Sequence, residues 1–343
     1  MRKVKPALCT LIGLLMILAS VERAGSVTTS ASGCVNQDGD GQRKAIVATF
    51  SIVARDSVTG ELGVAVASKF FTVGNVVPWA RADIGAVATQ SYANTTFGWR
   101  GLDMLESGLS PQQVLDSLLR TDDHPARRQV GIVGADGNSA TYTGDSCLDW
   151  AGGLSGPNYA VQGNILAGED VVMAMEKVFL ESDGNLADRL FNALVAGESM
   201  GGDLRGKQSA ALLVVKDKAG YGGYTDRAID IRVDDHPEPF KELGRLLVLA
   251  QTNYAWNEAW TLFTEQKYEA ALPYMEKAAE LSPKYPEVLY DLACIRLAAG
   301  DEAGALKAIT DAIGMNPKLK QQAVVDNDLD NLRDNEDFKK LLE

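Results

Sequence analysis

The residues from Thr49 to Phe70, TFSIVARDSVTGELGVAVASKF, constrain the fold of this chain more than any other stretch. Two apolar, β-rich runs flank the short polar segment SVTGE, which is typical of a β-hairpin. The second run, Gly63 to Ser68, is small and apolar on both faces, as expected of a strand that is covered on both sides. A turn near Thr59 places Thr49 opposite Lys69 or its neighbour, so that a hydroxyl at a strand start lies beside an amine.

Strand and helix signals continue to about residue 247. Ser110 and Pro111 have the pattern of a helix N-cap and first turn, and Ala135 to Asn138 is the turn of a second hairpin. Further strands are expected at residues 84–90, 129–133, 139–143, 159–164, 209–216 and 229–233, and helices at 101–107, 111–119, 170–182 and 185–197. Two layers of strands with helices before and after them predict an α+β fold, a four-layer α/β/β/α sandwich over residues 49–247.

The C-terminal residues 248–343 are helical in pattern and contain a repeat. Leu272 and Leu306 match, as do Pro283 and Pro317, at a spacing of about 34 residues. This spacing predicts tetratricopeptide-like helix pairs, with a final capping helix near residues 337–342. Two roles remain open for them: a surface that binds a peptide or protein partner, or a brace or dimer contact.

The first 26 residues have the pattern of a signal peptide. A basic start (Arg2, Lys3, Lys5) precedes an apolar run over residues 6–19, and Ala24 to Ser26 offers a cleavage site. No other stretch is long enough to cross a bilayer. We therefore expect a secreted or periplasmic protein without a membrane span after signal removal, in which residues 27–48 form a linker or a propeptide.

Export also changes the interpretation of the cysteines. Under oxidising conditions Cys34 and Cys147 are candidates for a disulfide, whereas Cys294 has apolar neighbours in the repeat and is expected to be a buried thiol. The chain has two histidines and no CxxC motif, so no metal site is expected.

Charge and motifs exclude several other functions. The formal net charge of −13 over 343 residues argues against nucleic acid and against an anionic membrane surface as partners. The sequence contains no G-x-S-x-G elbow, no P-loop and no dinucleotide fingerprint. We expect no cofactor and a small-molecule or peptide substrate, and a homo-oligomer is one candidate for the oligomeric state, which the sequence leaves open.

Several motifs in order resemble one known family. They are TFSIVARD, TGELGVAVASKF, GAVATQSYAN, the QGN at residues 162–164, GGDLRGKQSAALLV and IRVDDHPEP. Together they look like domain-of-unknown-function family 1028, which is placed among proteins with a fold like the N-terminal-nucleophile (Ntn) hydrolases. The resemblance covers residues 49–247 and implies the α/β/β/α sandwich already predicted from the strand and helix pattern.

The resemblance also implies a mechanism. In Ntn hydrolases a Thr, Ser or Cys begins the mature chain at a strand start, and its own α-amine acts as the general base. Thr49 would then be both nucleophile and base, with Lys69 beside it. Gln90 and Asn94 are the candidate donors to an oxyanion.

Three further residues are candidates for substrate binding. Asp203 and Gln208 lie in a glycine-rich bend, where a salt-bridged loop that includes Arg205 is the alternative. His236 follows the last strand, where a turn histidine is the alternative.

The mechanism requires cleavage between Ala48 and Thr49. Our leading hypothesis is an exported Ntn-type amidohydrolase that cleaves a linear amide bond in a peptide, an acyl-amino acid or a cell-wall fragment. The alternative is a catalytically inactive binding or surface-assembly module that uses the cleft of the fold and the helical repeats.

Overall fold

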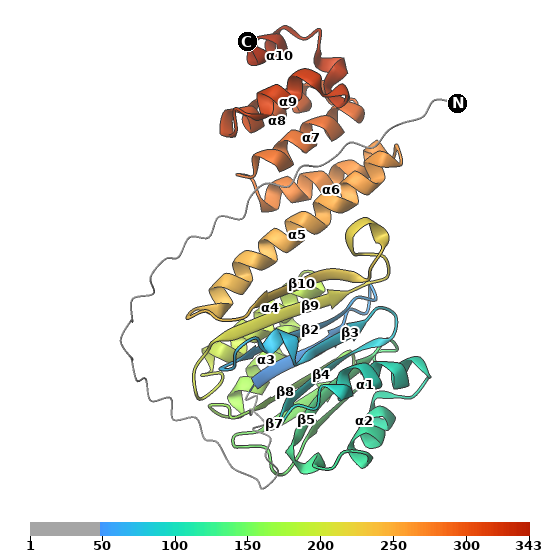
Figure 1. The fold of residues 1–343 in the computed structure, drawn as a ribbon, viewed down its shortest axis with the longest axis vertical. Coiled ribbons are helices and arrows are strands. Elements are labelled where there is room, and N and C mark those ends of the chain that lie inside the picture. The colour runs from blue at the N-terminus through green and yellow to red at the C-terminus, as the bar shows by residue number, and fades with distance from the viewer. Residues whose placement is uncertain (1–48) are drawn as a thin grey trace, which may run out of the picture. The chain divides into compact units, whose positions relative to one another are not determined.

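The computed structural model describes residues 49–343, which hold two antiparallel β-sheets and a C-terminal run of helices (Figure 1). The predicted mixed α+β class is confirmed. The predicted signal peptide, the segment 27–48 and Cys34 lie outside the described residues. No helix of residues 49–343 has the length and apolar character needed to cross a membrane.

The larger sheet has six strands in the order β10-β9-β2-β1-β8-β7. Their bounds are Thr49–Arg55 (β1), Leu62–Ser68 (β2), Gly152–Gly156 (β7), Tyr159–Asn164 (β8), Ser209–Val215 (β9) and Arg227–Val233 (β10). The predicted hairpin is the β1–β2 pair, in which Phe50 lies opposite Ala67. Continued by one residue, this register puts Thr49 opposite Ser68, the neighbour of Lys69.

The second sheet has four strands in the order β3-β4-β5-β6. They span Pro78–Arg81 (β3), Gly85–Ser91 (β4), Arg128–Gly134 (β5) and Ser139–Thr143 (β6). The two sheets pack face to face, because Val53, Val64 and Val66 share one core cluster with Ala86 and Val133. β-branched and small residues on these facing sides remove apolar surface from water and leave little space between the sheets.

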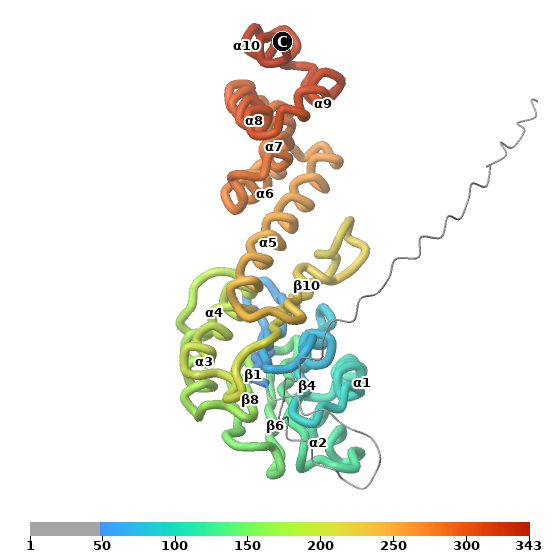
Figure 2. Tube along the Cα trace, turned by 60° about the vertical axis from the view of Figure 1, so that its left-hand side comes forward, coloured from blue at the N-terminus to red at the C-terminus, as the bar shows by residue number. Residues whose placement is uncertain are grey.

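Two helix pairs cover the outer faces of the sheets. The helices α3 (Asp170–Glu181) and α4 (Leu186–Ser199) pack on the six-stranded sheet, and α1 (Thr96–Glu106) and α2 (Pro111–Arg120) pack on the four-stranded sheet. Figure 2 shows α3 and α4 on one side of the strands and α1 and α2 on the other. Short 3-10 helices lie at Val73–Asn75, Pro125–Arg127, Tyr221–Gly223 and Asn327–Leu332.

Two local predictions need correction. The sequence pattern predicts no strand between the hairpin and residue 84, but Pro78 begins the edge strand β3, where a missing N–H is tolerated. The helix expected from residue 101 begins at Thr96, and the Asn94 side chain accepts a hydrogen bond from the Thr96 backbone N–H in the turn that leads into it. The predicted cap at Ser110 is present as a complete capping box.

The C-terminal helices are α5 (Pro239–Thr264), α6 (Tyr268–Leu281), α7 (Pro286–Ala298), α8 (Glu302–Met315), α9 (Leu319–Val325) and α10 (Glu336–Leu342). The helix α5 is 26 residues long and contributes to two cores. Phe240 and Leu243 pack in the core of the six-stranded sheet, whereas Ala255 and Ala259 pack with the repeats. Cys294 is a buried thiol, as predicted, and burial raises its pKa.

Candidate functional site

The candidate nucleophile lies on a central strand of the six-stranded sheet, at the edge of the sheet that is formed by strand ends. Thr49 is the first residue of β1 and pairs with Asn164, the last residue of β8, while Ser68 ends β2 and pairs with Ser209, which begins β9. All four residues are buried. The Thr49 Oγ1 hydroxyl donates to Ser68 Oγ at 3.3 Å. Antiparallel pairing therefore gathers four polar side chains from four strands at this edge, which we call the Thr49 edge.

A buried polar layer continues from the Thr49 edge between the two sheets. Gln90 of β4 donates through Nε2 to the Thr49 carbonyl (3.2 Å), to Gln129 Oε1 (2.9 Å) and to the Gln162 carbonyl (3.3 Å). Ser51 donates to Gln90 Oε1 at 2.6 Å and accepts from Gln162 Nε2 at 2.7 Å. Because buried polar groups must find partners inside the protein, this network fixes the separation and register of the two sheets.

Asn164 is held by the same layer. Its Nδ2 donates to Gln129 Oε1 at 2.8 Å. Its Oδ1 is buried, and no described residue donates to it. The Thr49 edge therefore contains one buried acceptor that is unfilled within residues 49–343.

Lys69 and Asp203 lie beside the Thr49 edge, in different roles. Lys69 is exposed, and its Nζ donates to the Lys207 carbonyl at 3.4 Å. Its backbone N–H donates to Asp203 Oδ2 at 2.8 Å, and Arg205 donates to both oxygens of this buried carboxylate. Asp203 thus braces the glycine-rich bend against the end of β2, which is the alternative described above for this residue.

Sequence reasoning also missed a carboxylate in this bend. Glu198, at the end of α4, is half-buried, and its Oε1 lies 3.9 Å from Lys207 Nζ. Burial raises the pKa of Glu198, and the Lys207 charge offsets only part of that effect.

Gln208 and His236 connect the end of β2 to the start of α5. The Gln208 N–H donates to the Ser68 carbonyl at 3.1 Å, and the Gln208 carbonyl accepts from the His236 N–H at 2.9 Å. The Gln208 side chain donates to Asp235 at 3.1 Å, and the Glu238 N–H donates to His236 Nδ1 at 2.9 Å. Both side chains are therefore engaged in the turn that precedes α5.

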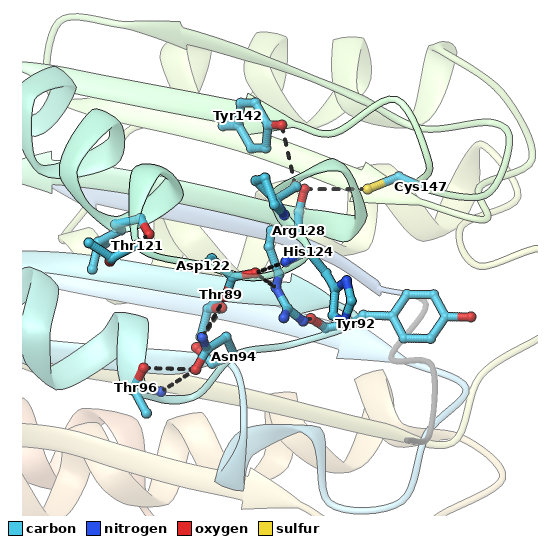
Figure 3. Close-up of polar contacts among 12 residues, drawn as sticks. Thr89, Tyr92, Asn94, Thr96, Thr121, Asp122, His124, Arg128, Tyr142 and Cys147 are labelled. Atoms are coloured by element: carbon cyan, nitrogen blue, oxygen red, sulfur yellow. Dashed lines mark hydrogen bonds and ion pairs between the residues drawn. The ribbon is translucent and has the colours of Figure 1, made fainter. Parts of the chain in front are cut away.

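The two predicted oxyanion donors are separated into different clusters. The Gln90 amide belongs to the polar layer, where its Nε2 already has three acceptors. Asn94 donates through Nδ2 to Asp122 at 2.7 Å and accepts from Thr96 through Oδ1, at the start of α1 (Figure 3).

Asp122 is the centre of that second cluster. It accepts from Arg128 Nε at 2.9 Å, and Arg128 also donates to the Tyr92 carbonyl (Figure 3). Burial would raise the pKa of Asp122, but the hydrogen bonds from Asn94 and Arg128 together hold it below its usual value. A satisfied buried ion pair of this kind orders the loop between α2 and β5.

Cys147 is half-buried and donates to the Arg128 carbonyl at 3.4 Å. Within residues 49–343 it forms no disulfide. Its predicted partner, Cys34, lies outside the described residues, so the disulfide stays a prediction.

Six residues of the Thr49 edge and polar layer were not singled out as site residues from the sequence: Ser51, Ser68, Gln129, Gln162, Asn164 and Ser209. Gln162 and Asn164 belong to the QGN motif, and Gln129 directly precedes the apolar residues 130–134 of β5. The sequence signal that could have identified these residues is a polar side chain at a strand position whose neighbours are apolar.

The fold and these residues define a protein of one family. A model described as "Family of unknown function (DUF1028)" matches residues 49–243, and the chain belongs to this family. A tetratricopeptide repeat model matches residues 262–324. The family resemblance and the tetratricopeptide-like repeat predicted from the 34-residue spacing are thereby both confirmed.

A crystal structure of a Silicibacter pomeroyi protein, also described as DUF1028, is similar to this chain. The two share 31% sequence identity with a TM-score of 0.54, and the similarity covers 60% of this chain and 89% of the other. No curated protein matches the chain.

Proposed function

We propose that the chain is an exported Ntn-type amidohydrolase in which Thr49, freed by cleavage of the Ala48–Thr49 bond, is nucleophile and base. The observation that supports this most is the position of Thr49. The family match begins at this residue, and the same residue begins β1 in the middle of the six-stranded sheet. We also propose that the two facing sheets with their outer helix pairs are the α/β/β/α sandwich of the Ntn hydrolases. Export rests on the signal-like sequence of residues 1–26.

Maturation adds one water across the Ala48–Thr49 peptide bond and leaves a carboxyl group on Ala48 and an amine on Thr49. In the first half of the reaction the Thr49 hydroxyl oxygen attacks the substrate carbonyl carbon, and its proton passes to the Thr49 amine. The tetrahedral intermediate then expels the substrate amine, which takes up that proton. An acyl ester on Thr49 Oγ1 remains.

The second half of the reaction regenerates the enzyme. The Thr49 amine accepts a proton from water as the water oxygen attacks the ester carbon. Collapse of the second intermediate breaks the bond to Oγ1, which regains the proton, and the carboxylic acid leaves.

The neighbouring residues have supporting roles in this scheme. Ser68 accepts the hydrogen bond of the Thr49 hydroxyl in the present geometry, and Gln90 holds the Thr49 carbonyl. We assign Gln90 to orienting Thr49, because its amide hydrogens are already engaged. We assign the exposed Lys69 side chain to stabilising the negative charge that develops in the reaction.

The test is hydrolysis of a panel of N-acyl-amino acids, dipeptides and cell-wall peptides, and the released primary amine is measured. Thr49→Ala is expected to abolish turnover while the far-UV circular dichroism stays unchanged. Thr49→Ser is expected to retain measurable turnover, because serine keeps both hydroxyl and amine. Turnover by Thr49→Ala at the wild-type rate on any substrate of the panel contradicts the nucleophile assignment.

The second candidate function is a binding or surface-assembly module without catalysis. It is favoured by the tetratricopeptide match, because such repeats commonly bind proteins. It is also favoured by Trp256 of α5 and by Tyr285, the residue before α7, whose rings contact each other and are partly exposed. This function predicts a mature chain that begins near residue 26. It also predicts that Thr49→Ala does not change the binding of a partner.

A further inference from the structure

We propose that Asn164 is the residue that positions the base: once the Ala48–Thr49 bond is cut, Asn164 Oδ1 accepts a hydrogen bond from the Thr49 α-amine. This inference rests on the proposed function and assigns a role to a residue that the sequence did not single out. It starts from the buried oxygen that no described residue satisfies.

The orientation of the Asn164 amide follows from its neighbours. Gln129 Nε2 donates to the carbonyls of Gly163 (2.6 Å) and Gly152 (3.3 Å) and to Thr143 Oγ1 (2.9 Å). Gln129 must therefore turn its Oε1 toward Gln90 and Asn164, and only the NH₂ end of Asn164 can face it. The Oδ1 end of the Asn164 amide therefore faces away from Gln129 and is left to accept another hydrogen bond.

Asn164 also lies at the right place. It is the direct cross-strand partner of Thr49 in the β1–β8 ladder, and side chains of such pairs project from the same face with Cβ atoms about 4.5–5.5 Å apart. That face is the inner one, because Asn164 contacts Gln129 of the other sheet. A buried carbonyl oxygen without a donor destabilises the fold, so a hydrogen bond from a donor that arrives here is favourable.

Cleavage supplies such a donor. The peptide nitrogen of Thr49 carries one hydrogen, whereas the amine carries two and the ammonium three. The Thr49 hydroxyl already donates to Ser68. The new hydrogens of the amine are therefore the donors that cleavage makes available to Asn164. A hydrogen bond from one amine N–H to Asn164 fixes the rotation of the amine and leaves its lone pair for the hydroxyl proton.

The neutral amide suits this role better than a carboxylate. A carboxylate at the same place would stabilise the ammonium form and raise the pKa of the amine, so that less free base is present at neutral pH. An amide orients the amine without adding charge.

The test uses the full chain, secreted by an exporting host, with intact mass measured first. The pKa of the Thr49 amine is then obtained from the pH dependence of its acetylation by trace acetic anhydride, read on the N-terminal peptide. Asn164→Asp is expected to raise this pKa by about one unit. Asn164→Leu is expected to keep the cut terminus but to lower turnover of any substrate from the panel at least about tenfold.

The control is Asn158→Asp, which adds the same charge at the other end of the β1–β8 ladder, where Asn158 accepts from Arg55 at 3.2 Å. It is expected to leave the amine pKa unchanged. If the chain is cut at Thr49 but both Asn164 variants show the wild-type amine pKa and turnover, the role of Asn164 is refuted and the hydrolase proposal stands. If the chain is never cut, both proposals fail.

A crystal structure of the cut wild-type protein covers the case in which neither variant folds. The distance from the Thr49 nitrogen to Asn164 Oδ1 is expected to be about 2.7–3.2 Å. A separation beyond about 4 Å overturns the inference.

Discussion

Replacing Gly131 by alanine tests the polar layer between the sheets. A Cβ atom on Gly131 would lie 2.1 Å from Gln162 Oε1 and 2.5 Å from Gln162 Cδ, far inside normal contact. Gln162 is fully buried, so its side chain has no water to move into. The substitution must therefore displace Gln162 from the layer.

The magnitude follows from the hydrogen bonds that Gln162 makes. Displacement breaks the bonds from its Nε2 to Ser51 Oγ (2.7 Å) and to the Ser51 carbonyl (3.2 Å), and the bond from Thr141 to its Oε1 (3.2 Å). At about 1 kcal/mol each, with a further 1–3 kcal/mol for overpacking, Gly131→Ala is expected to destabilise the sheet domain by about 4–6 kcal/mol.

Urea unfolding followed by far-UV circular dichroism measures the free energy of unfolding. Gly168→Ala is the matched control, because nothing lies within 4 Å of the Cβ it would add, and its effect is expected to stay within about 0.5 kcal/mol. A Gly131→Ala protein as stable as the control would refute the tight packing of Gln162 on β5.

Two further predictions concern acids with shifted pKa values. The pKa of Asp122 is lowered in the folded state, so its ion pair with Arg128 stabilises the protein above pH ~4, and this stabilisation is lost as pH falls through the lowered pKa. Asp122→Asn should therefore reduce the fall of Tm at acid pH. An equal fall of Tm in the variant and the wild type would contradict this. The pKa of Asp291 is shifted in the opposite direction: burial raises it to about 6, although Trp256 and Trp260 both donate to the carboxylate. The free energy of unfolding should therefore fall as pH rises from about 4 to 6. Asp291→Asn should remove that loss, measured as Tm against pH, and an unchanged slope would count against the burial of this carboxylate.

The sequence predicted those features of the fold that depend on local pattern. Alternation and turn residues located the β1–β2 hairpin to its register within one residue, and the Ser110 pattern located the start of α2. The 34-residue spacing, as in Leu272 and Leu306, located the repeats, because the period can be read from the sequence without knowledge of tertiary contacts.

The candidate site was less predictable because it depends on contacts between distant strands. Gln90, Gln129 and Gln162 come from three strands in two sheets, and nothing local to any of them indicates the other two. The contacts of Asn94 were unpredictable for a related reason: its side chain bonds to Asp122 and to the first turn of α1. Thr49 itself was proposed from a family resemblance and from its expected place at a strand start, and its role stays a prediction.

The central claim is that the base is a free amine on the residue that carries the attacking oxygen. The most direct measurement is to identify the first residue of the secreted protein by mass spectrometry of its N-terminal peptide, in the same preparation that hydrolyses an amide of the panel. The account predicts Thr49 with an unblocked amine. Hydrolysis by a chain in which Thr49 is still joined to Ala48 would contradict it.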